Sequence, residues 1–93
     1  MATFAQLMLT STPMNIVTHW GLSRGSRYQL VNSSGSQRTV VLYEGAASPP
    51  STDSSSVIPL YAQEDAVITV DSSDDIYAWV RSGEGSLSCA EAP

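Results

Sequence analysis

Short segments in which apolar and polar residues alternate recur along this chain, and turn-forming residues separate them. A period of two is that of a β-strand, because successive side chains point to opposite faces. The clearest example is residues 76–81, where Ile76, Ala78 and Val80 alternate with larger side chains. Tyr77 and Trp79 occupy the other face, so this strand is apolar on both sides.

Two glycines follow this strand within Ser82–Ser86, and Leu87–Ala90 then supplies a second apolar segment. Glycine adopts positive φ at no steric cost, as short hairpin connections require. The pattern therefore predicts a terminal β-hairpin that runs almost to the last residue. The polar segment Asp71–Asp75 is predicted to be the turn before it.

The same reasoning predicts further strands at residues 14–20, 27–32, 37–44, 57–61 and 66–70. Because the polar segment 32–36 separates two of them, residues 27–44 are expected to form a second hairpin. Pro59 lacks an N–H, which restricts its strand to an edge or an irregular position. The Ser/Pro-rich residues 45–56 are expected to be a crossing loop.

The N-terminal segment Phe4–Thr10 fits both helical spacing and strand alternation. Its Ser/Thr content and Pro13 would limit a helix to about two turns. We therefore favour an extended N-terminal arm over residues 1–12.

Taken together, about seven short antiparallel strands and no convincing helix indicate an all-β fold. We expect a single domain over residues 1–93, either a β-sandwich or a partly open barrel. A chain of 93 residues can bury one thin core and little more.

The net charge and the length of the apolar runs limit the kinds of partner that we expect. The chain has no lysine, and its four basic residues stand against nine acidic ones, for a net charge of −5. Nucleic-acid binding needs clustered positive charge, so no nucleic-acid partner is expected. No apolar run approaches the roughly 20 residues that span a bilayer, and the N-terminus lacks the basic region of a secretory signal. We expect a protein made in the cytoplasm, with no membrane partner.

Residues that could perform chemistry are scarce. The chain has one histidine, His19, and one cysteine, Cys89, which argues against a multi-histidine or Cys-x-x-Cys metal site. The sequence also contains no recognisable catalytic motif. Cys89 is expected to be a buried structural thiol. The Asp71–Asp75 segment lacks the ligand spacing of a calcium loop. We therefore predict no enzyme activity, no cofactor and no metal.

Apolar and aromatic side chains are the remaining candidates for binding. The rings could build the core, a subunit interface or a platform on which a sugar stacks. The sugar platform would use Trp20, Tyr77 or Trp79. The side chains that we expect at a partner interface are Phe4, Leu7, Leu9, Trp20, Tyr77 and Trp79.

Two segments, residues 22–32 and 76–88, resemble strands of small virion proteins of tailed bacteriophages. The first contains a Gly-x-x-Tyr-x-hydrophobic-x-Asn pattern, and the second contains Tyr-Ala-Trp followed by Gly-x-Gly-x-Leu. The resemblance extends over about residues 16–91. Its motifs are structural, so it transfers no functional residue.

What the resemblance implies is a small β-domain attached in many copies to a capsid or tail. We expect a non-enzymatic virion structural protein, a capsid cement or decoration protein that bridges neighbouring major capsid subunits. Its partner would be the major capsid protein or another virion protein, and it would form a homo-oligomer. The alternatives are a component of the phage tail, neck or fibre, and a carbohydrate-binding β module.

Overall fold

The computed structural model describes residues 4–34, 39–45, 58–61, 64–71, 73–81 and 83–92. Within these ranges the chain forms eight strands and one short helix. In chain order they are β1 (Leu7–Leu9), β2 (Met14–Asn15), α1 (Ile16–Trp20), β3 (Arg27–Asn32), β4 (Val40–Gly45), β5 (Ile58–Leu60), β6 (Asp65–Thr69), β7 (Asp75–Val80) and β8 (Gly85–Glu91).

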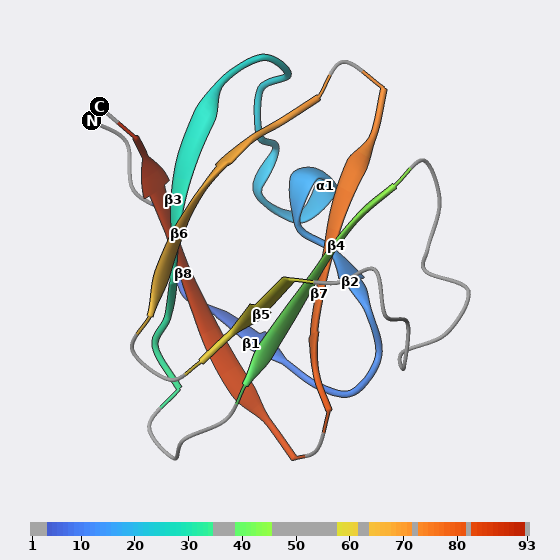
Figure 1. Cartoon of the computed structure of the whole chain (residues 1–93), viewed down its shortest axis with the longest axis vertical. Coiled ribbons are helices and arrows are strands. Elements are labelled where there is room, and N and C mark those ends of the chain that lie inside the picture. The colour runs from blue at the N-terminus through green and yellow to red at the C-terminus, as the bar shows by residue number, and fades with distance from the viewer. Residues whose placement is uncertain are drawn as a thin grey trace.

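The strands form two antiparallel four-stranded sheets that pack against each other (Figure 1). The β8 sheet has the order β1-β8-β3-β6, and the β7 sheet has the order β2-β7-β4-β5. Leucine, isoleucine and valine side chains from the inner faces of both sheets form one core, as in other sheet sandwiches. The predicted all-β sandwich is confirmed.

The order of strands is that of a jelly roll. The antiparallel pairs β1–β8, β2–β7, β3–β6 and β4–β5 describe one long hairpin whose tip lies between β4 and β5. Rolling up this hairpin brings β8 beside β3 and β7 beside β4, which completes the two sheets. Eight strands wound in this way are the jelly-roll form of the β-sandwich.

Neither predicted hairpin exists. β7 and β8 lie in different sheets, and so do β3 and β4. Both edges of β7 are occupied by β2 and β4, and both edges of β8 by β1 and β3. The glycine-containing connection after β7 therefore crosses from one sheet to the other, because the neighbours of each strand come from distant parts of the chain.

The N-terminal segment is extended, as predicted, but part of it belongs to the sheet and is not a separate arm. Leu7 and Leu9 face the core from β1, opposite Leu87 and Gly85 of β8. The backbone N–H of Phe4 also donates to the carbonyl of Cys89 at 3.1 Å. Residues 1–3 lie outside the described residues.

The strand predicted over residues 14–20 is wrong after its second residue. Asn15 caps a five-residue helix by accepting a hydrogen bond from the N–H of Thr18 at 3.1 Å. Gly21 ends the helix in the left-handed conformation at φ 64°. The helix buries Ile16 and Val17 against the core. No helix in the described part of the chain is long and apolar enough to span a membrane.

Candidate functional site

The sandwich is closed on one side and open on the other. On the closed side, β1 and β2 are the edge strands, and α1 fills the end of the core with Ile16 and Val17. On the open side, the edge strands are β5 and β6, and a cleft of about 330 Å³ lies between the sheets. This volume is at the lower limit of typical ligand pockets.

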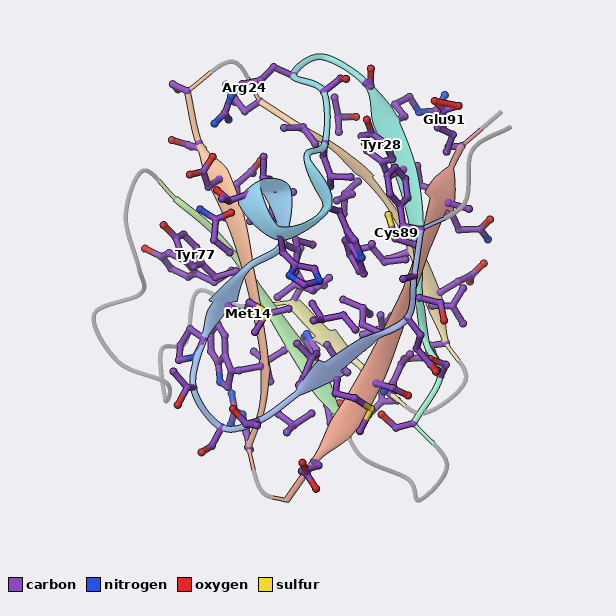
Figure 2. All side chains as sticks on the ribbon, turned by 180° about the vertical axis from the view of Figure 1, so that it is seen from behind. Met14, Arg24, Tyr28, Tyr77, Cys89 and Glu91 are labelled. Atoms are coloured by element: carbon purple, nitrogen blue, oxygen red, sulfur yellow. The ribbon has the colours of Figure 1, made fainter. Side chains whose placement is uncertain are left out.

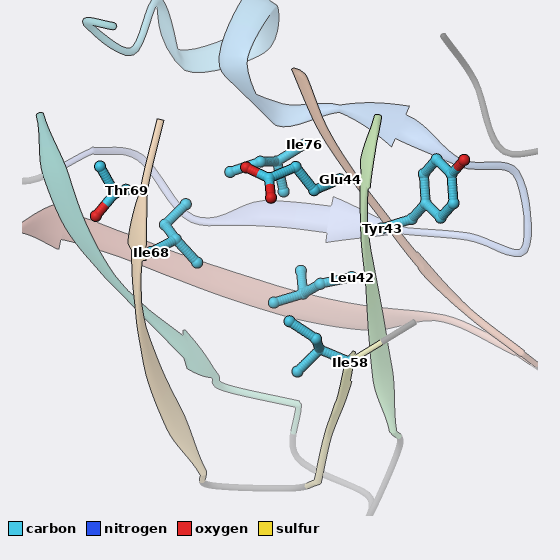
Figure 3. Close-up of a pocket in the computed structure, with 7 residues that line it drawn as sticks. All are labelled: Leu42, Tyr43, Glu44, Ile58, Ile68, Thr69 and Ile76. Atoms are coloured by element: carbon cyan, nitrogen blue, oxygen red, sulfur yellow. The ribbon is translucent and has the colours of Figure 1, made fainter. Parts of the chain in front are cut away.

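The cleft is apolar, with one carboxylate. Leu42 and Ile76 are buried at its base, and Ile58 and Ile68 face each other across it from β5 and β6 (Figure 3). Glu44 extends from β4 toward β6 at one end of the cleft. The Glu44 carboxylate is exposed and has no hydrogen bond or ion pair with any described residue.

Three large apolar side chains are exposed along the same side. Ile58 is 60% exposed, Tyr61 is 57% exposed and Val67 is 53% exposed. We call β5, β6, Tyr61 and the cleft between them the open border. Ile58 lines the cleft, whereas Val67 alternates with the inward-facing Ile68 and lies on the outer face of the β8 sheet. Exposed apolar side chains around an apolar cleft are typical of an interaction site. Met8 and Met14, which are also exposed, lie instead on the opposite edge strands, β1 and β2.

The two edges of the open border differ in how they are protected. Edge strands normally carry lysine, proline or a bulge, which prevents pairing with another chain. β5 has Pro59, whereas β6 has the sequence Asp-Ala-Val-Ile-Thr without lysine, proline or glycine. The one charged side chain of β6, Asp65, accepts a hydrogen bond from Gln29 at 2.6 Å. Among the described residues, β6 is therefore an edge strand that carries none of these blocking features.

Half of the predicted interface residues are inside the domain. Leu7 is 6% exposed, and Leu9 and Trp79 are fully buried within the single chain. Trp79 lies on the outer face of the β7 sheet opposite Val41, which is equally buried, and neither belongs to the main core. The chain itself covers these three side chains, so they offer little surface to a partner.

Phe4 and Trp20 are half-buried and hold the N-terminal segment in place. The Trp20 indole N–H donates to the carbonyl of Ala5 at 2.9 Å. The Phe4 ring lies 6.2 Å from the ring of Trp20 and 5.9 Å from that of Tyr28, measured between centroids. These contacts hold both rings against the domain, and each ring remains partly exposed.

Tyr77 is the third predicted interface residue that stays partly accessible, after Phe4 and Trp20. It is half-buried on the outer face of the β7 sheet, on the side of the molecule away from Cys89 (Figure 2). In the register it lies opposite Tyr43 of β4 and Asn15 of β2. Tyr77 is not among the residues that line the cleft of the open border, whereas its neighbour Tyr43 is (Figure 3).

The acidic turn before β7 binds the side chain of Arg24. The Arg24 guanidinium donates to the carbonyl oxygens of Asp71 at 3.1 Å and Asp74 at 2.7 Å, and it forms an ion pair with Asp75. The hydrogen bond from Arg24, together with a second from Asn15, lowers the pKa of Asp75 below its ordinary value. Among the described residues, no group of three His, Cys, Asp or Glu side chains is placed to bind a metal.

Cys89 and three serines of the β8 sheet are nucleophilic side chains without an activating base among the described residues. Cys89 is buried, as predicted, and burial raises the pKa of its thiol to about 11, so the thiol is protonated at neutral pH. Ser33, Ser86 and Ser88 bond to one another and to Gln6 on the outer face of the β8 sheet. Within the described ranges, the side-chain partners of these serines are Gln6 and one another, and neither a histidine nor a carboxylate that could activate a serine is among them.

Sequence reasoning missed the open border. Pro59 correctly indicated an edge strand, but nothing in the alternation of residues 66–70 showed that β6 is an edge as well.

Comparisons with protein-family models, with curated proteins and with solved structures found no match to this chain.

Proposed function

We propose that this protein is a non-enzymatic virion structural protein, a capsid cement or decoration protein that bridges neighbouring major capsid subunits of a tailed bacteriophage. The jelly roll supports the proposal, because this architecture serves in viral capsid domains as well as in lectins. Such support is an analogy of fold, since one fold carries many functions. The likeness of residues 22–32 and 76–88 to phage virion proteins adds to it.

The observation that carries the proposal is the open border. A domain of 93 residues with Ile58, Tyr61 and Val67 exposed beside an apolar cleft has surface that is more stable when a partner covers it. A cement protein needs such a surface, because it binds by burying area against neighbouring subunits, typically about 800 Å² per partner. The protein would be made in the host cytoplasm, form a homo-oligomer and reside in the virion.

The first test is the presence and copy number of the protein in purified phage particles. Quantitative mass spectrometry would compare it with the major capsid protein and with a tail protein as internal standards. A cement protein is present in hundreds of copies. A dozen copies or fewer would favour the alternative of a tail, neck or fibre component, and absence from the particle would reject both.

The second test asks whether the open border makes the contact. Replacing both Ile58 and Tyr61 by serine leaves the buried core intact and removes exposed apolar area. We expect this variant to fold and to lose attachment to capsids that lack the protein. Met8→Ser is the matched control, because Met8 is as exposed but lies on the opposite edge. Equal attachment of both variants would contradict a contact through the open border.

A carbohydrate-binding module remains the second candidate, and one pair of side chains favours it. Tyr43 and Tyr77 are cross-strand neighbours on the outer face of the β7 sheet, and paired rings can support a stacked sugar. Burial removes Trp79 from such a platform, and the indole N–H of Trp20 is already bonded to the carbonyl of Ala5. Glycan-array binding that Tyr77→Ala abolishes would support this function over the first.

A further inference from the structure

The edge of β6 away from β3 pairs with no other strand in the described part of the chain, and we call it the free edge. It presents a regular set of backbone groups. At the two ends of β6, Asn32 N–H donates to Glu64 O at 2.9 Å, and Val70 N–H donates to Ser26 O at 3.0 Å. In an antiparallel ladder, the residues that bond to one neighbour alternate with those whose backbone groups point the other way. The residues whose N–H and C=O groups face the free edge are therefore Asp65, Val67 and Thr69.

An added strand would extend the β8 sheet over the cleft. Residues directly opposite each other in neighbouring strands point to the same face of a sheet. Ile68 points into the cleft (Figure 3), so the residue opposite Ile68 in an added strand would point there too. It would meet Ile58 and Leu42. The cleft therefore favours an aliphatic side chain at this position.

The position two residues further along the added strand, opposite Val70, lies on the same face. Thr69, the neighbour of Val70 in β6, lines the cleft together with Glu44 (Figure 3), so we infer that this position falls toward the Glu44 end of the cleft. Glu44 is exposed and has no ion-pair partner among the described residues, so a basic side chain at this position would complement it.

We propose that the open border binds an extended segment of a partner protein, which pairs with the free edge of β6 and carries an aliphatic and a basic residue two positions apart. The aliphatic side chain enters the cleft, and the basic side chain pairs with Glu44. This mode is strand addition, in which backbone hydrogen bonds give affinity and pockets for alternate side chains give specificity. The inference rests on the proposed function for the source of the segment, which would be a neighbouring virion subunit.

A second copy of this chain fits the site less well. Pairing of β6 with another β6 would bring Asp-Ala-Val-Ile-Thr against the border, and this strand has no basic residue to meet Glu44. Its sole charged side chain is Asp65, which would add negative charge to a protein of net charge −5. A basic partner segment therefore agrees better with the charges of the border.

The test uses the full chain and the synthetic peptide Ac-Ser-Thr-Arg-Thr-Val-Thr-Ser-NH2, with a glutamate replacing arginine in the control peptide. Hydrogen exchange of individual amides is followed by NMR with and without peptide. We expect the arginine peptide to slow exchange at the edge-facing amides of Val67 and Thr69. The amides of Ala66 and Ile68 already bond to β3, so their exchange should change less. Unchanged exchange at Val67 and Thr69 at saturating peptide would overturn strand addition.

The charge requirement is tested with Glu44→Gln. An exposed ion pair contributes little free energy, so we expect the wild-type chain to bind the arginine peptide about threefold more tightly than the glutamate peptide. We expect Glu44→Gln to remove this preference. If the variant keeps it, Glu44 is not the partner of the basic residue.

Edge variants provide a test of the backbone pairing. Val67→Pro removes an N–H that faces the free edge and should abolish peptide binding, while Val67→Thr keeps that N–H and should bind. Thermal unfolding confirms that each variant folds, and the exchange measurement on the unmodified chain does not depend on these variants.

Protection of the Val67 and Thr69 amides that rises with protein concentration in the absence of peptide would identify a second copy of the chain as the occupant. This result would overturn the proposal.

Failure of this inference and failure of the proposed function give different results. If the protein is abundant in virions but no peptide protects the β6 edge, the proposed function is supported and strand addition is rejected. If the peptide binds as expected but the protein is absent from particles, the border is a strand-addition site in another assembly.

Discussion

At the residue scale, Met8 and Leu9 are neighbours in β1 with opposite surroundings. Leu9 is fully buried in the core, and Met8 is 57% exposed on the outer face of the sheet. We expect Leu9→Ala to lower the free energy of unfolding by about 2–5 kcal/mol, because it leaves a cavity. Met8→Ala should change it by less than about 0.5 kcal/mol. Urea unfolding measures both, and equal effects would mean that β1 does not pack as described.

Asp75 gives the stability of the fold a pH dependence. Its carboxylate is favoured in the folded state by the hydrogen bonds from Arg24 and Asn15, so its pKa is lower when the chain is folded. The stabilisation is complete above the ordinary pKa of 3.8 and is lost as the pH falls through the lower folded value. The same arginine also bonds to the carbonyls of Asp71 and Asp74, and this contribution does not depend on the protonation of Asp75.

We therefore expect Arg24→Met to lower the melting temperature at pH 6, and the difference from the wild type to narrow as the pH falls below 3.8. Thermal unfolding at a series of pH values measures this difference. Arg27→Met is the control, because the Arg27 side chain forms no ion pair with the described residues. A difference that stays constant down to the lowest pH would show that Asp75 contributes nothing to it.

Single residues also show where sequence reasoning stops. Cys89 could be predicted as a buried thiol, because it lies on an apolar strand. Asn32 ends the strand predicted over residues 27–32 and begins the polar segment 32–36. In the structure it is fully buried, and its side-chain N–H donates to the carbonyl of Leu60 at 2.8 Å. This bond joins β3 of one sheet to β5 of the other. Only the packing of the sheets brings a buried acceptor within reach, and alternation along the chain carries no such information.

At the scale of elements, strand existence was largely predictable and strand pairing was not. Residues 27–32 and 76–80 alternate clearly and form β3 and β7. Hairpins were inferred from nearby glycines, but the pairing of β7 with β4 depends on a distant strand. The helix at Ile16–Trp20 was missed because its β-branched residues favour strands, whereas the cap at Asn15 and the left-handed Gly21 determine its conformation.

The N-terminal strand gives a prediction that differs from that for a free arm. A free arm could be deleted without loss of folding, but deletion of residues 1–10 removes Leu7 and Leu9 from the core and uncovers the edge of β8. Two buried leucines contribute about as much as the whole stability of a small domain. We expect the deletion variant to lose its cooperative thermal transition, followed by circular dichroism. A variant that unfolds cooperatively near the wild-type temperature would contradict the role of β1.

At the scale of the whole molecule, the jelly roll determines which surface is free. Winding one long hairpin leaves four edge strands, and α1 closes the side of β1 and β2 while the side of β5 and β6 stays open. The sequence predicted a sandwich from its short alternating strands. It could not predict the open border, because β5 and β6 become the two edges of one cleft only through the winding of the chain.

The central claim is that this domain joins virion subunits through its open border, and a density map of the intact particle, at a resolution that traces strands, tests it most directly. We expect the domain in many copies at junctions between capsid subunits, with an extended segment of a neighbouring subunit beside β6. A basic side chain of that segment should lie against Glu44. A particle without the domain, or one in which β6 and the cleft face solvent, would contradict the claim.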